Sequence, residues 1–488
     1  MFSLNSLALQ VEGVIIGDRV DFKNLSIVTD SRKVTKDSVF IAIEGPTSDG
    51  HNFLEDVLVK SPICVIINTS QSNLIQGKSP FITVQDTRKA LAILAAQQYK
   101  NPAKKIKLIG VTGTNGKTST VWIIHELLKL LGKKSFRIGT LGVDGLKNSA
   151  EYSNLTTPGP HELNKLLAEA LTQDIEYCVL EVSSHALDQD RVFNLPFYWV
   201  GLTNITRDHL DYHKTFENYI AAKEKIFEFS NQGGICIDNI SCEEIYNRQI
   251  KNNKNITSLG FNKKADIQLI KRLDKELLLI FEIIKTNNHY KSKTNYVGAH
   301  NLENIGLAVS CLESLEIAPI EKIMALLKTI PPVPGRLEPV GSAEFPVFVD
   351  YAHTPDALEK VLQTLKPLTK NKLWVIFGCG GNRDKGKRPL MAEAAAKYAD
   401  FVVVTSDNPR KEDPELIIQD ILASGINAKY VNVDRKIAIE ETLKMALSGD
   451  TVLIAGKGHE DYQIIGEEKF YFSDQAVVKA LFNKTSIY

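Results

Sequence analysis

The stretch that most constrains this chain runs from Lys107 to Leu128 and reads KLIGVTGTNGKTSTVWIIHELL. An apolar run typical of a β-strand leads into a tight glycine-containing turn, and a helical pattern follows. The turn carries Gly113, Gly116, Lys117 and Thr118 in the spacing G-x-x-G-K-T. Glycines let backbone N–H groups point inward, the helix N-terminus adds positive potential, and the lysine and hydroxyl can meet phosphate and Mg²⁺. The sequence therefore predicts a phosphate-binding loop.

The spacing of this loop differs from the common pattern G-x-x-x-x-G-K-[ST], which would place a glycine at position 111. Val111 stands there, and Gly113 is the first glycine of the turn. A glycine-rich turn without a ligand is the alternative interpretation. It is disfavoured because Gly-Lys-Thr directly at a helix start is uncommon in plain turns. We interpret the stretch as a shorter phosphate loop.

Composition restricts the protein class. The 488 residues are too many for one hydrophobic core and indicate three domains within a range of two to four. Acidic and basic residues balance at 58 each, so no overall field would hold nucleic acid or an anionic membrane. The six cysteines form no C-x-x-C pair, which favours buried reduced thiols. No run reaches roughly 18 apolar residues, and we expect no signal peptide. We expect a cytoplasmic monomer with small-molecule partners, no nucleic acid and no membrane.

Two boundaries, after residues 101 and 332, divide the strand and helix patterns. Residues 1–101 alternate short apolar strands with helices and precede the phosphate loop. The run Pro331-Pro332-Val333-Pro334-Gly335 is the clearest linker, and an α/β rhythm resumes after it. We predict an α/β protein of three domains, 1–101, 102–332 and 333–488. The central domain would be a P-loop ATPase-like parallel sheet, flanked by a small N-terminal α/β domain and a C-terminal Rossmann-like α/β domain.

Polar side chains follow two predicted strands of the central domain. The strand at 177–181 ends on Glu181, and the strand at 198–202 leads to a cluster that includes Asp208 and His209. Ligands collect outside the carboxyl ends of strands in an open parallel sheet. A carboxylate and an imidazole there could hold a metal or move protons. The alternative, helix capping, would explain one aspartate of the cluster.

A lysine falls in the apolar stripe of the helix predicted at 216–230. At about 100° per residue, Lys223 lies on the side of Tyr219 and Phe227, whereas Lys225 points away. Desolvation lowers a lysine pKa, and a neutral amine can take up CO₂ to give a metal-binding carbamate. The alternative is a lysine whose stem is covered while its ammonium reaches water. Judged by the helix pattern alone, the alternative is favoured.

The predicted strands of the third domain each end in a polar loop. These loops hold Asp350, residues 378–388, residues 407–410 and residues 456–460. Each loop alone is weak evidence, because Asp-Asn-Pro and glycine runs also make good turns. Together, on one edge of one predicted sheet, they favour a binding edge.

In combination, these segments resemble the Mur ligase family. The chain carries TGTNGKTST, EVSSHALDQDR, TNITRDHLDYH, YIAAKEKIF, GAHNLEN, PGRLE, VDYAHTPDAL, GCGGNRDKGKRP, DNPR and AGKGHEDYQ in the family's order. The resemblance covers essentially the whole chain, and the short phosphate loop is regular for this family. DNPR and GGNRDKGKRP make the chain most similar to members that add the third residue of the peptidoglycan stem peptide. It looks like the form that adds meso-2,6-diaminopimelate in preference to the form that adds L-lysine.

The resemblance implies an ATP-dependent ligase that extends the D-Glu carboxylate of UDP-N-acetylmuramoyl-L-Ala-D-Glu through an acyl phosphate. It assigns nucleotide contacts to Gly113, Thr114, Asn115, Gly116, Lys117, Thr118, Ser119, Asn301, Arg336 and Asp350. The implied Mg²⁺ ligands are Thr118, Glu181, His209 and Lys223, the last as a carbamate formed with CO₂. Catalytic roles would fall to Lys117, Glu181, His209 and Lys223.

The resemblance further implies two substrate sites. The UDP-muramoyl dipeptide would meet Ser31, Thr47, Thr156, Thr157, Ser183, Gln189 and Arg191. The amino acid pocket would comprise Arg383, Asp407, Asn408, Pro409, Arg410, Gly456 and Glu460. Leu155 departs from the family pattern, because a relative has asparagine before the two threonines.

Two rival interpretations remain. A folylpolyglutamate synthetase should begin close to its phosphate loop and has no reason to carry DNPR, whereas about a hundred residues precede the loop here. A nucleotide-binding module without catalysis is opposed by the phosphate and metal groups implied at Lys117, Glu181, His209 and Lys223.

Overall fold

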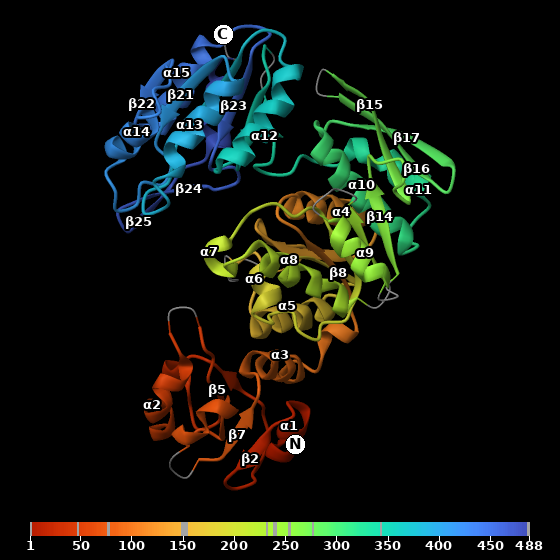
Figure 1. Cartoon of the computed structure of the whole chain (residues 1–488), viewed down its shortest axis with the longest axis vertical. Helices are drawn as coiled ribbons and strands as arrows, with labels where there is room; N and C mark the ends of the chain where they lie inside the picture. The colour runs from red at the N-terminus through yellow and green to blue at the C-terminus, as the bar shows by residue number, and fades with distance from the viewer. Residues whose placement is uncertain are drawn as a thin grey trace. The chain divides into compact units, whose positions relative to one another are not determined.

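The computed structural model describes residues 2–45, 48–75, 79–147, 155–230, 233–237, 242–251, 255–275, 278–341 and 344–485. The chain forms two compact units that are interleaved in sequence. The first comprises Met1–Gln268, Lys285–Asn288 and Glu303–Ile323, and the second comprises Leu269–Ile284, His289–Leu302 and Met324–Tyr488. Strands and helices alternate along the chain, as the α/β prediction requires (Figure 1). The predicted domain boundaries after residues 101 and 332 stay predictions.

A sheet with the order β2-β7-β6-β5-β4 opens the first unit. Its strands are parallel except for β2 at the edge. Strands β5 to β7 are almost continuously apolar and buried, which is typical of a sheet covered on both faces. The elements of this region are β1 (Phe2–Ser3), α1 (Leu4–Gln10), β2 (Val14–Ile16), β3 (Asp21–Phe22), β4 (Ile27–Val28), η1 (Ser31–Lys33), β5 (Val39–Ile41), η2 (Gly50–Phe53), α2 (Leu54–Val59), β6 (Cys64–Asn68), η3 (Thr69–Leu74), β7 (Phe81–Val84), α3 (Thr87–Gln98) and η4 (Pro102–Lys104).

The next sheet has the order β10-β9-β11-β8-β12-β13-β14-β15-β16-β17. Its strands are β8 (Lys107–Thr112), β9 (Ser135–Gly139), β10 (Gly142–Asp144), β11 (Tyr177–Glu181), β12 (Phe197–Leu202), β13 (Gly234–Ile237), β14 (Ile256–Gly260), β15 (Ile267–Lys275), β16 (Leu278–Lys285) and β17 (Asn288–Thr294). The helices of the same stretch are α4 (Lys117–Leu130), α5 (Pro160–Thr172), α6 (Ser184–Asp188), α7 (Leu210–His213), α8 (Phe216–Glu224), η6 (Lys225–Phe229), α9 (Glu243–Lys251), α10 (Ala299–Ser314), α11 (Ile320–Leu326) and η7 (Leu327–Thr329).

Strand β8 lies between β11 and β12 and is parallel to both. The register puts Glu181, the last residue of β11, opposite Val111, and Leu202, the last residue of β12, opposite Thr112. The carboxyl ends of three strands therefore meet where the phosphate loop begins. This edge is where ligands bind in open parallel sheets.

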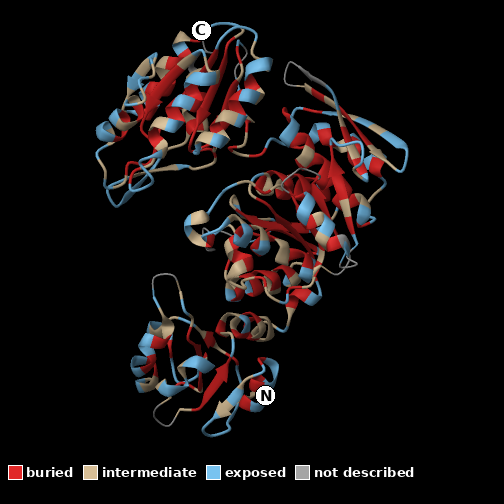
Figure 2. Cartoon of the chain, in the orientation of Figure 1, coloured by how far each residue is buried: buried red, intermediate tan, exposed pale blue. Residues whose placement is uncertain are grey.

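A sheet with the order β18-β19-β23-β20-β21-β22 organises the second unit, and only its β18–β19 pair is antiparallel. One apolar cluster packs α12 to α14 on one face, and another packs α15 and α16 on the opposite face. The inner strands β19, β20, β21 and β23 are accordingly buried and the outer helix faces exposed (Figure 2). The elements are β18 (Glu338–Pro339), β19 (Val347–Asp350), α12 (Pro355–Leu365), η8 (Lys366–Leu368), β20 (Leu373–Phe377), α13 (Lys387–Tyr398), β21 (Phe401–Thr405), α14 (Pro414–Leu422), β22 (Tyr430–Asn432), α15 (Arg435–Met445), β23 (Thr451–Ala455), β24 (Tyr462–Ile465), β25 (Glu468–Tyr471) and α16 (Asp474–Thr485).

The predicted helix at 216–230 is shorter than expected. It is α-helical only to Glu224, and residues Lys225–Phe229 continue as a 3₁₀-helix. Such tightening is common at helix ends, where the last carbonyls lack α-helical partners. The predicted strand at 177–181 agrees with β11 in full.

Two expectations from composition can be compared with the structure. All six cysteines are free and buried, as predicted for reduced thiols. Within the described ranges, no helix combines the length and apolar character that crossing a bilayer requires.

Candidate active site

The loop between β8 and α4 has the backbone shape that its glycines predict. Gly113 and Gly116 have positive φ angles of 144° and 86°. A side chain at position 113 would collide with Thr203, and one at position 116 would collide with Asn304. Helix α4 begins directly after Gly116, so the unbonded N–H groups of its first turn open toward the loop. The loop can therefore hold a phosphate with main-chain donors.

Two residues that sequence reasoning missed hold this loop in place. Asn204, just after β12, accepts the Asn115 N–H through its side chain at 3.0 Å. Its main-chain carbonyl accepts the Thr114 N–H at 2.7 Å. The Tyr219 hydroxyl of α8 lies 2.8 Å from the Thr114 hydroxyl. The sequence shows only that Asn204 follows a predicted strand, and the fold shows that this strand lies beside β8.

Two lysines donate to the same carbonyl oxygen of the loop. Lys117 Nζ donates to the carbonyls of Gly113 at 2.8 Å and Thr114 at 2.9 Å. Lys223 Nζ donates to the Gly113 carbonyl at 2.7 Å, and Lys223 is only 1% exposed. Burial holds the pKa of Lys223 well below its usual value, and the positive charge of Lys117 lowers it further. The predicted apolar placement of Lys223 is confirmed, and the alternative of an ammonium in water is wrong.

Glu181 is a buried carboxylate, 1% exposed, which the sheet register places opposite Val111, two residues before Gly113. It accepts the Thr118 hydroxyl at 3.0 Å, and the N–H and hydroxyl of Thr140 at 2.9 and 3.1 Å. A side chain at Gly139 would collide with this carboxylate, so the glycine keeps the space free. Carboxylate and hydroxyl oxygens are hard ligands, and the Thr118–Glu181 donor set fits Mg²⁺.

His209 lies on the turn that begins α7, with a φ angle of 52°. Its ring is 3.5 Å from the Asp208 carboxylate and makes an edge contact with His185 at 4.8 Å between ring centroids. Burial, together with the neighbouring His209, lowers the pKa of His185 to about 4. In the part of the chain that is described, His209 and Glu181 share no hydrogen bond or ion pair. The metal role of His209 stays a prediction.

The residues predicted for the UDP-muramoyl dipeptide in the central region form one polar network. The Thr157 hydroxyl donates to the Glu181 carbonyl at 2.7 Å and accepts the Ser183 N–H at 3.0 Å. The Arg191 guanidinium donates to the Thr157 carbonyl at 2.9 Å and to Gln189 Oε1 at 2.7 and 3.1 Å. Thr156 joins through its hydroxyl, which lies 3.2 Å from that of Thr140. The network adjoins the Glu181 carboxylate.

Two further predicted contacts, Ser31 and Thr47, stand near the N-terminus. Ser31 begins η1, and its carbonyl accepts Lys60 Nζ at 2.8 Å. Thr47 lies outside the described residues. Their roles stay predictions.

The predicted amino acid pocket lies on loops after β20, β21 and β23. Asn408 Nδ2 donates to the Glu460 carboxylate at 3.0 Å, and Asn408 Oδ1 accepts Lys457 Nζ at 3.1 Å. Arg410 Nη1 donates to the Gly381 carbonyl at 2.9 Å. These contacts join the loop that carries DNPR to the loop after β20 and to the loop after β23. Lys457, fully buried between acidic groups, is a residue that sequence reasoning did not select.

The remaining predicted contacts have separate surroundings. Asp350 is buried and accepts the N–H groups of Leu337 at 2.6 Å and Ala352 at 2.7 Å. Burial raises the pKa of Asp350, although the neighbouring Arg336 opposes the rise. Asn301 donates to the carbonyl of Val297 at 2.9 Å. Arg383 is exposed on the loop after β20, and Pro409 follows Asn408 as a buried residue.

The sheet order and the loop at 113–118 define an α/β protein with a nucleotide-binding phosphate loop. Family models match three stretches of the chain: the Mur ligase family catalytic domain at 25–99, the Mur ligase middle domain at 111–312, and the Mur ligase glutamate ligase domain at 335–458. The chain belongs to the Mur ligase family, whose members are ATP-dependent ligases.

Curated relatives match nearly the full length. The UDP-N-acetylmuramoyl-L-alanyl-D-glutamate–2,6-diaminopimelate ligase 1 of Clostridium acetobutylicum is 40% identical over 471 residues, which cover 95% of this chain and 96% of that protein. The 2,6-diaminopimelate ligase of Aquifex aeolicus is 40% identical over 459 residues, which cover 93% of each chain.

Solved structures give the same fold. A UDP-N-acetylmuramoyl-L-alanyl-D-glutamate–2,6-diaminopimelate ligase matches with a TM-score of 0.71 and 30% identity, covering 96% of this chain and 97% of that chain. A folylpolyglutamate synthase of Mycobacterium tuberculosis matches with a TM-score of 0.63 and 18% identity, covering 76% of this chain and 92% of that chain. The second likeness shows the fold alone.

Proposed function

We propose that this protein joins meso-2,6-diaminopimelate to the D-Glu carboxylate of UDP-N-acetylmuramoyl-L-Ala-D-Glu, using ATP, in cytoplasmic peptidoglycan precursor synthesis. The single observation that carries the proposal is the near full-length match, at 40% identity, to relatives named for that reaction. The L-lysine-adding reaction is the second candidate. It would use the same chemistry at the phosphate loop.

Amide formation requires an activated carboxylate. A carboxylate oxygen of the substrate attacks the γ-phosphorus of ATP, the bond to the bridging oxygen breaks, and ADP leaves. The amine then attacks the acyl carbon, phosphate leaves, and the amine loses a proton. Lys117 would neutralise the charge of the transferred phosphoryl group, which otherwise repels the anionic carboxylate. The main-chain donors of residues 113–118 would orient the phosphates.

Thr118, Glu181, His209 and the carbamate of Lys223 would hold Mg²⁺. When bound, Mg²⁺ would reduce the repulsion between the carboxylate and the phosphates. Carbamate formation bonds Lys223 Nζ to the carbon of CO₂ and releases one proton. The buried position of Lys223 against the loop supports this proposal, because an amine shielded from water resists protonation.

The amino acid substrate would bind at the DNPR loop. Diaminopimelate carries a second carboxylate that lysine lacks, and a guanidinium is a bidentate partner for it. Arg410 has a φ angle of 52°, and its contact with Gly381 orients the guanidinium along the loop after β20. Arg410 is therefore our candidate for selecting diaminopimelate.

A direct assay tests the proposed function. The full chain is incubated with ATP, Mg²⁺, bicarbonate and UDP-N-acetylmuramoyl-L-Ala-D-Glu, and either meso-diaminopimelate or L-lysine is added. We expect ADP and phosphate release, together with a tripeptide product by mass spectrometry, mainly with diaminopimelate. Product formed mainly with L-lysine would favour the second candidate, and the absence of product with both would overturn the proposal.

Replacing Arg410 with alanine tests the amino acid site. We expect kcat/KM for diaminopimelate to fall about 10- to 100-fold, because hydrogen bonds to a charged group are lost. The KM for ATP should change less than about twofold, since the phosphate contacts lie elsewhere in the chain. Steady-state phosphate release measures both constants. Lys411→Ala is the matched control, because Lys411 is exposed and pairs with Glu467. A kcat/KM within about twofold of wild type for Arg410→Ala would contradict the assignment.

A further inference from the structure

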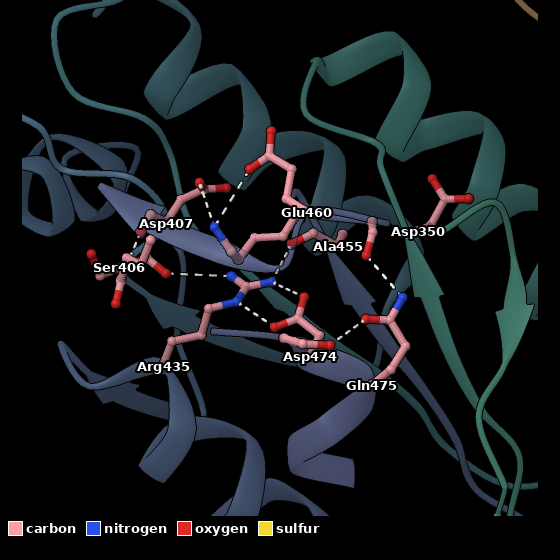
Figure 3. Close-up of polar contacts among 12 residues, drawn as sticks. Asp350, Ser406, Asp407, Arg435, Ala455, Glu460, Asp474 and Gln475 are labelled. Atoms are coloured by element: carbon pink, nitrogen blue, oxygen red, sulfur yellow. Dashed lines mark hydrogen bonds and ion pairs between the residues drawn. The ribbon is translucent and has the colours of Figure 1, made fainter. Parts of the chain in front are cut away.

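A buried ion pair lies directly behind the loops that carry the candidate amino acid site. Arg435 and Asp474 are the first residues of α15 and α16, and both side chains are 0% exposed. Arg435 Nε and Nη2 donate to the two Asp474 carboxylate oxygens at 2.8 Å each. Figure 3 shows the guanidinium held by Asp474 on one side, with its other donors directed at strand ends.

Those other donors connect two strands that are not neighbours in the sheet. Arg435 Nη1 donates to the Ser406 carbonyl after β21 at 3.3 Å, and Nη2 donates to the Ala455 carbonyl at the end of β23 at 3.0 Å (Figure 3). Strand β20 lies between β21 and β23. The guanidinium thus bridges the carboxyl ends of two strands across the strand between them.

Each bridged residue immediately precedes a predicted substrate contact. Asp407 follows Ser406, and Gly456 follows Ala455. The two loops approach so closely that a side chain at Gly456, which has a φ angle of 112°, would lie 2.8 Å from Asp407 Oδ2. A small change in the separation of the strand ends would therefore change the spacing of the contacts.

Contacts between side chains of the two loops also depend on the separation of the strand ends. Asn408 from one loop donates to Glu460 of the other at 3.0 Å, and Lys457 donates to Asn408 at 3.1 Å. A buried ion pair contributes little net stability compared with apolar residues of similar volume. Stability alone is therefore a weak reason for an arginine at this position.

We propose that Arg435, oriented by Asp474, is a positioning residue that sets the separation of the 406–410 and 456–460 loops and so the affinity for the incoming amino acid. The inference rests on the proposed function for the identity of that substrate. Arg435 acts through main-chain carbonyls and does not itself touch the substrate. The groups that bind a substrate must keep their geometry to within about half an ångström, so a shift of either loop weakens binding.

The test compares Arg435→Lys with Asp450→Asn in the full-length enzyme. Lysine keeps the positive charge but cannot bond both carbonyls and Asp474 together. Asp450 is a buried residue at the opposite, amino-terminal edge of the same sheet. Its carboxylate accepts hydrogen bonds from Trp374 Nε1 at 2.9 Å and from the Lys372 N–H at 3.1 Å. It therefore controls for general loss of stability.

We expect Arg435→Lys to raise the KM for diaminopimelate about tenfold, with kcat changed less than about threefold and the KM for ATP less than about twofold. Asp450→Asn should lower the melting temperature without changing any of these constants. Equal KM values for diaminopimelate in Arg435→Lys and wild type would overturn the proposal.

A double variant, Arg435→Met with Asp474→Leu, removes the pair without leaving a buried charge. It should melt near the wild-type temperature and still show the raised KM, whereas a wild-type KM would assign the pair to stability alone. Hydrogen exchange of the two loop segments gives a readout that needs no activity. Exchange there should be faster in Arg435→Lys and unchanged in Asp450→Asn, and unchanged exchange in both would overturn the proposal. A wild-type enzyme inactive with every amino acid would overturn the proposed function but leave this exchange test intact.

Discussion

Replacing Lys117 with alanine is expected to lower kcat about 10³-fold in the ligase assay, the largest single effect among the variants considered. The ammonium lies within 3 Å of the Gly113 and Thr114 carbonyls, at the base of the phosphate loop. No other side chain of this loop carries a positive charge. If Lys117 acts as we propose, the charge that accumulates on the transferred phosphoryl group would lose its direct protein counterion in this variant. Steady-state release of ADP with all three substrates measures the loss.

The control for this variant lies on the same helix. Lys129→Ala removes a half-exposed lysine of α4 that pairs with Glu126 at 2.9 Å. Its kcat should stay within about twofold of wild type, because Lys129 lies in the last turn of α4, at the opposite end of the helix from the phosphate loop. Thermal melting of both variants separates loss of folding from loss of catalysis. If Lys117→Ala retained more than about a tenth of the wild-type kcat, the role of Lys117 in phosphoryl transfer would be wrong.

The sequence predicted well those features that depend on neighbouring residues. Strand β11 and the carboxylate at its end follow from an apolar run that stops at Glu181. The loop glycines follow from their spacing before Lys117, and their positive φ angles agree. Helix periodicity alone placed Lys223 in an apolar stripe. In each case the signal is contained in a short stretch of chain.

Features that depend on strand order could not be predicted in this way. Asn204 supports the phosphate loop only because β12 lies beside β8, and Thr140 bonds Glu181 only because β9 lies beside β11. Arg435 follows Asp434 at a helix start, where an arginine is usually exposed. Its burial depends on Asp474, 39 residues later in the chain. These contacts join residues that lie far apart in the sequence, so they can be identified only when the complete fold is known.

The fold also decides between two interpretations of the surroundings of Lys223. The helix pattern favoured an ammonium that reaches water, whereas the family resemblance implied a buried carbamate. Lys223 is 1% exposed and donates to Gly113, so its amine lies against the phosphate loop. A buried ammonium beside Lys117 would face like-charge repulsion as well as the cost of desolvation. Conversion to a carbamate would replace this cation with an anion that can meet a metal.

Replacing Lys223 with alanine is therefore expected to lower kcat about 10²- to 10³-fold, the second of the two largest losses. The cavity left by the side chain would lack the anionic group that the proposed carbamate supplies. Short carboxylic acids such as formate or acetate should restore activity in a concentration-dependent manner by supplying that group. Lys225→Ala is the matched control: Lys225 is two residues further on, in η6, and is only partly buried. Its activity should stay near wild type and should not respond to acetate.

Rescue and labelling together decide whether Lys223 acts as a carbamate or as an amine. With ¹³C-bicarbonate, the wild-type enzyme should show a carbamate carbon signal by NMR that Lys223→Ala lacks and Lys225→Ala retains. Removing bicarbonate and CO₂ should lower wild-type activity, because the carbamate forms reversibly. If wild type stayed fully active without a carbamate signal, and acetate failed to restore Lys223→Ala, the lysine would act through its ammonium. It would then share the role of Lys117 at the Gly113 carbonyl, and the negative charge at the Mg²⁺ site would come from Glu181.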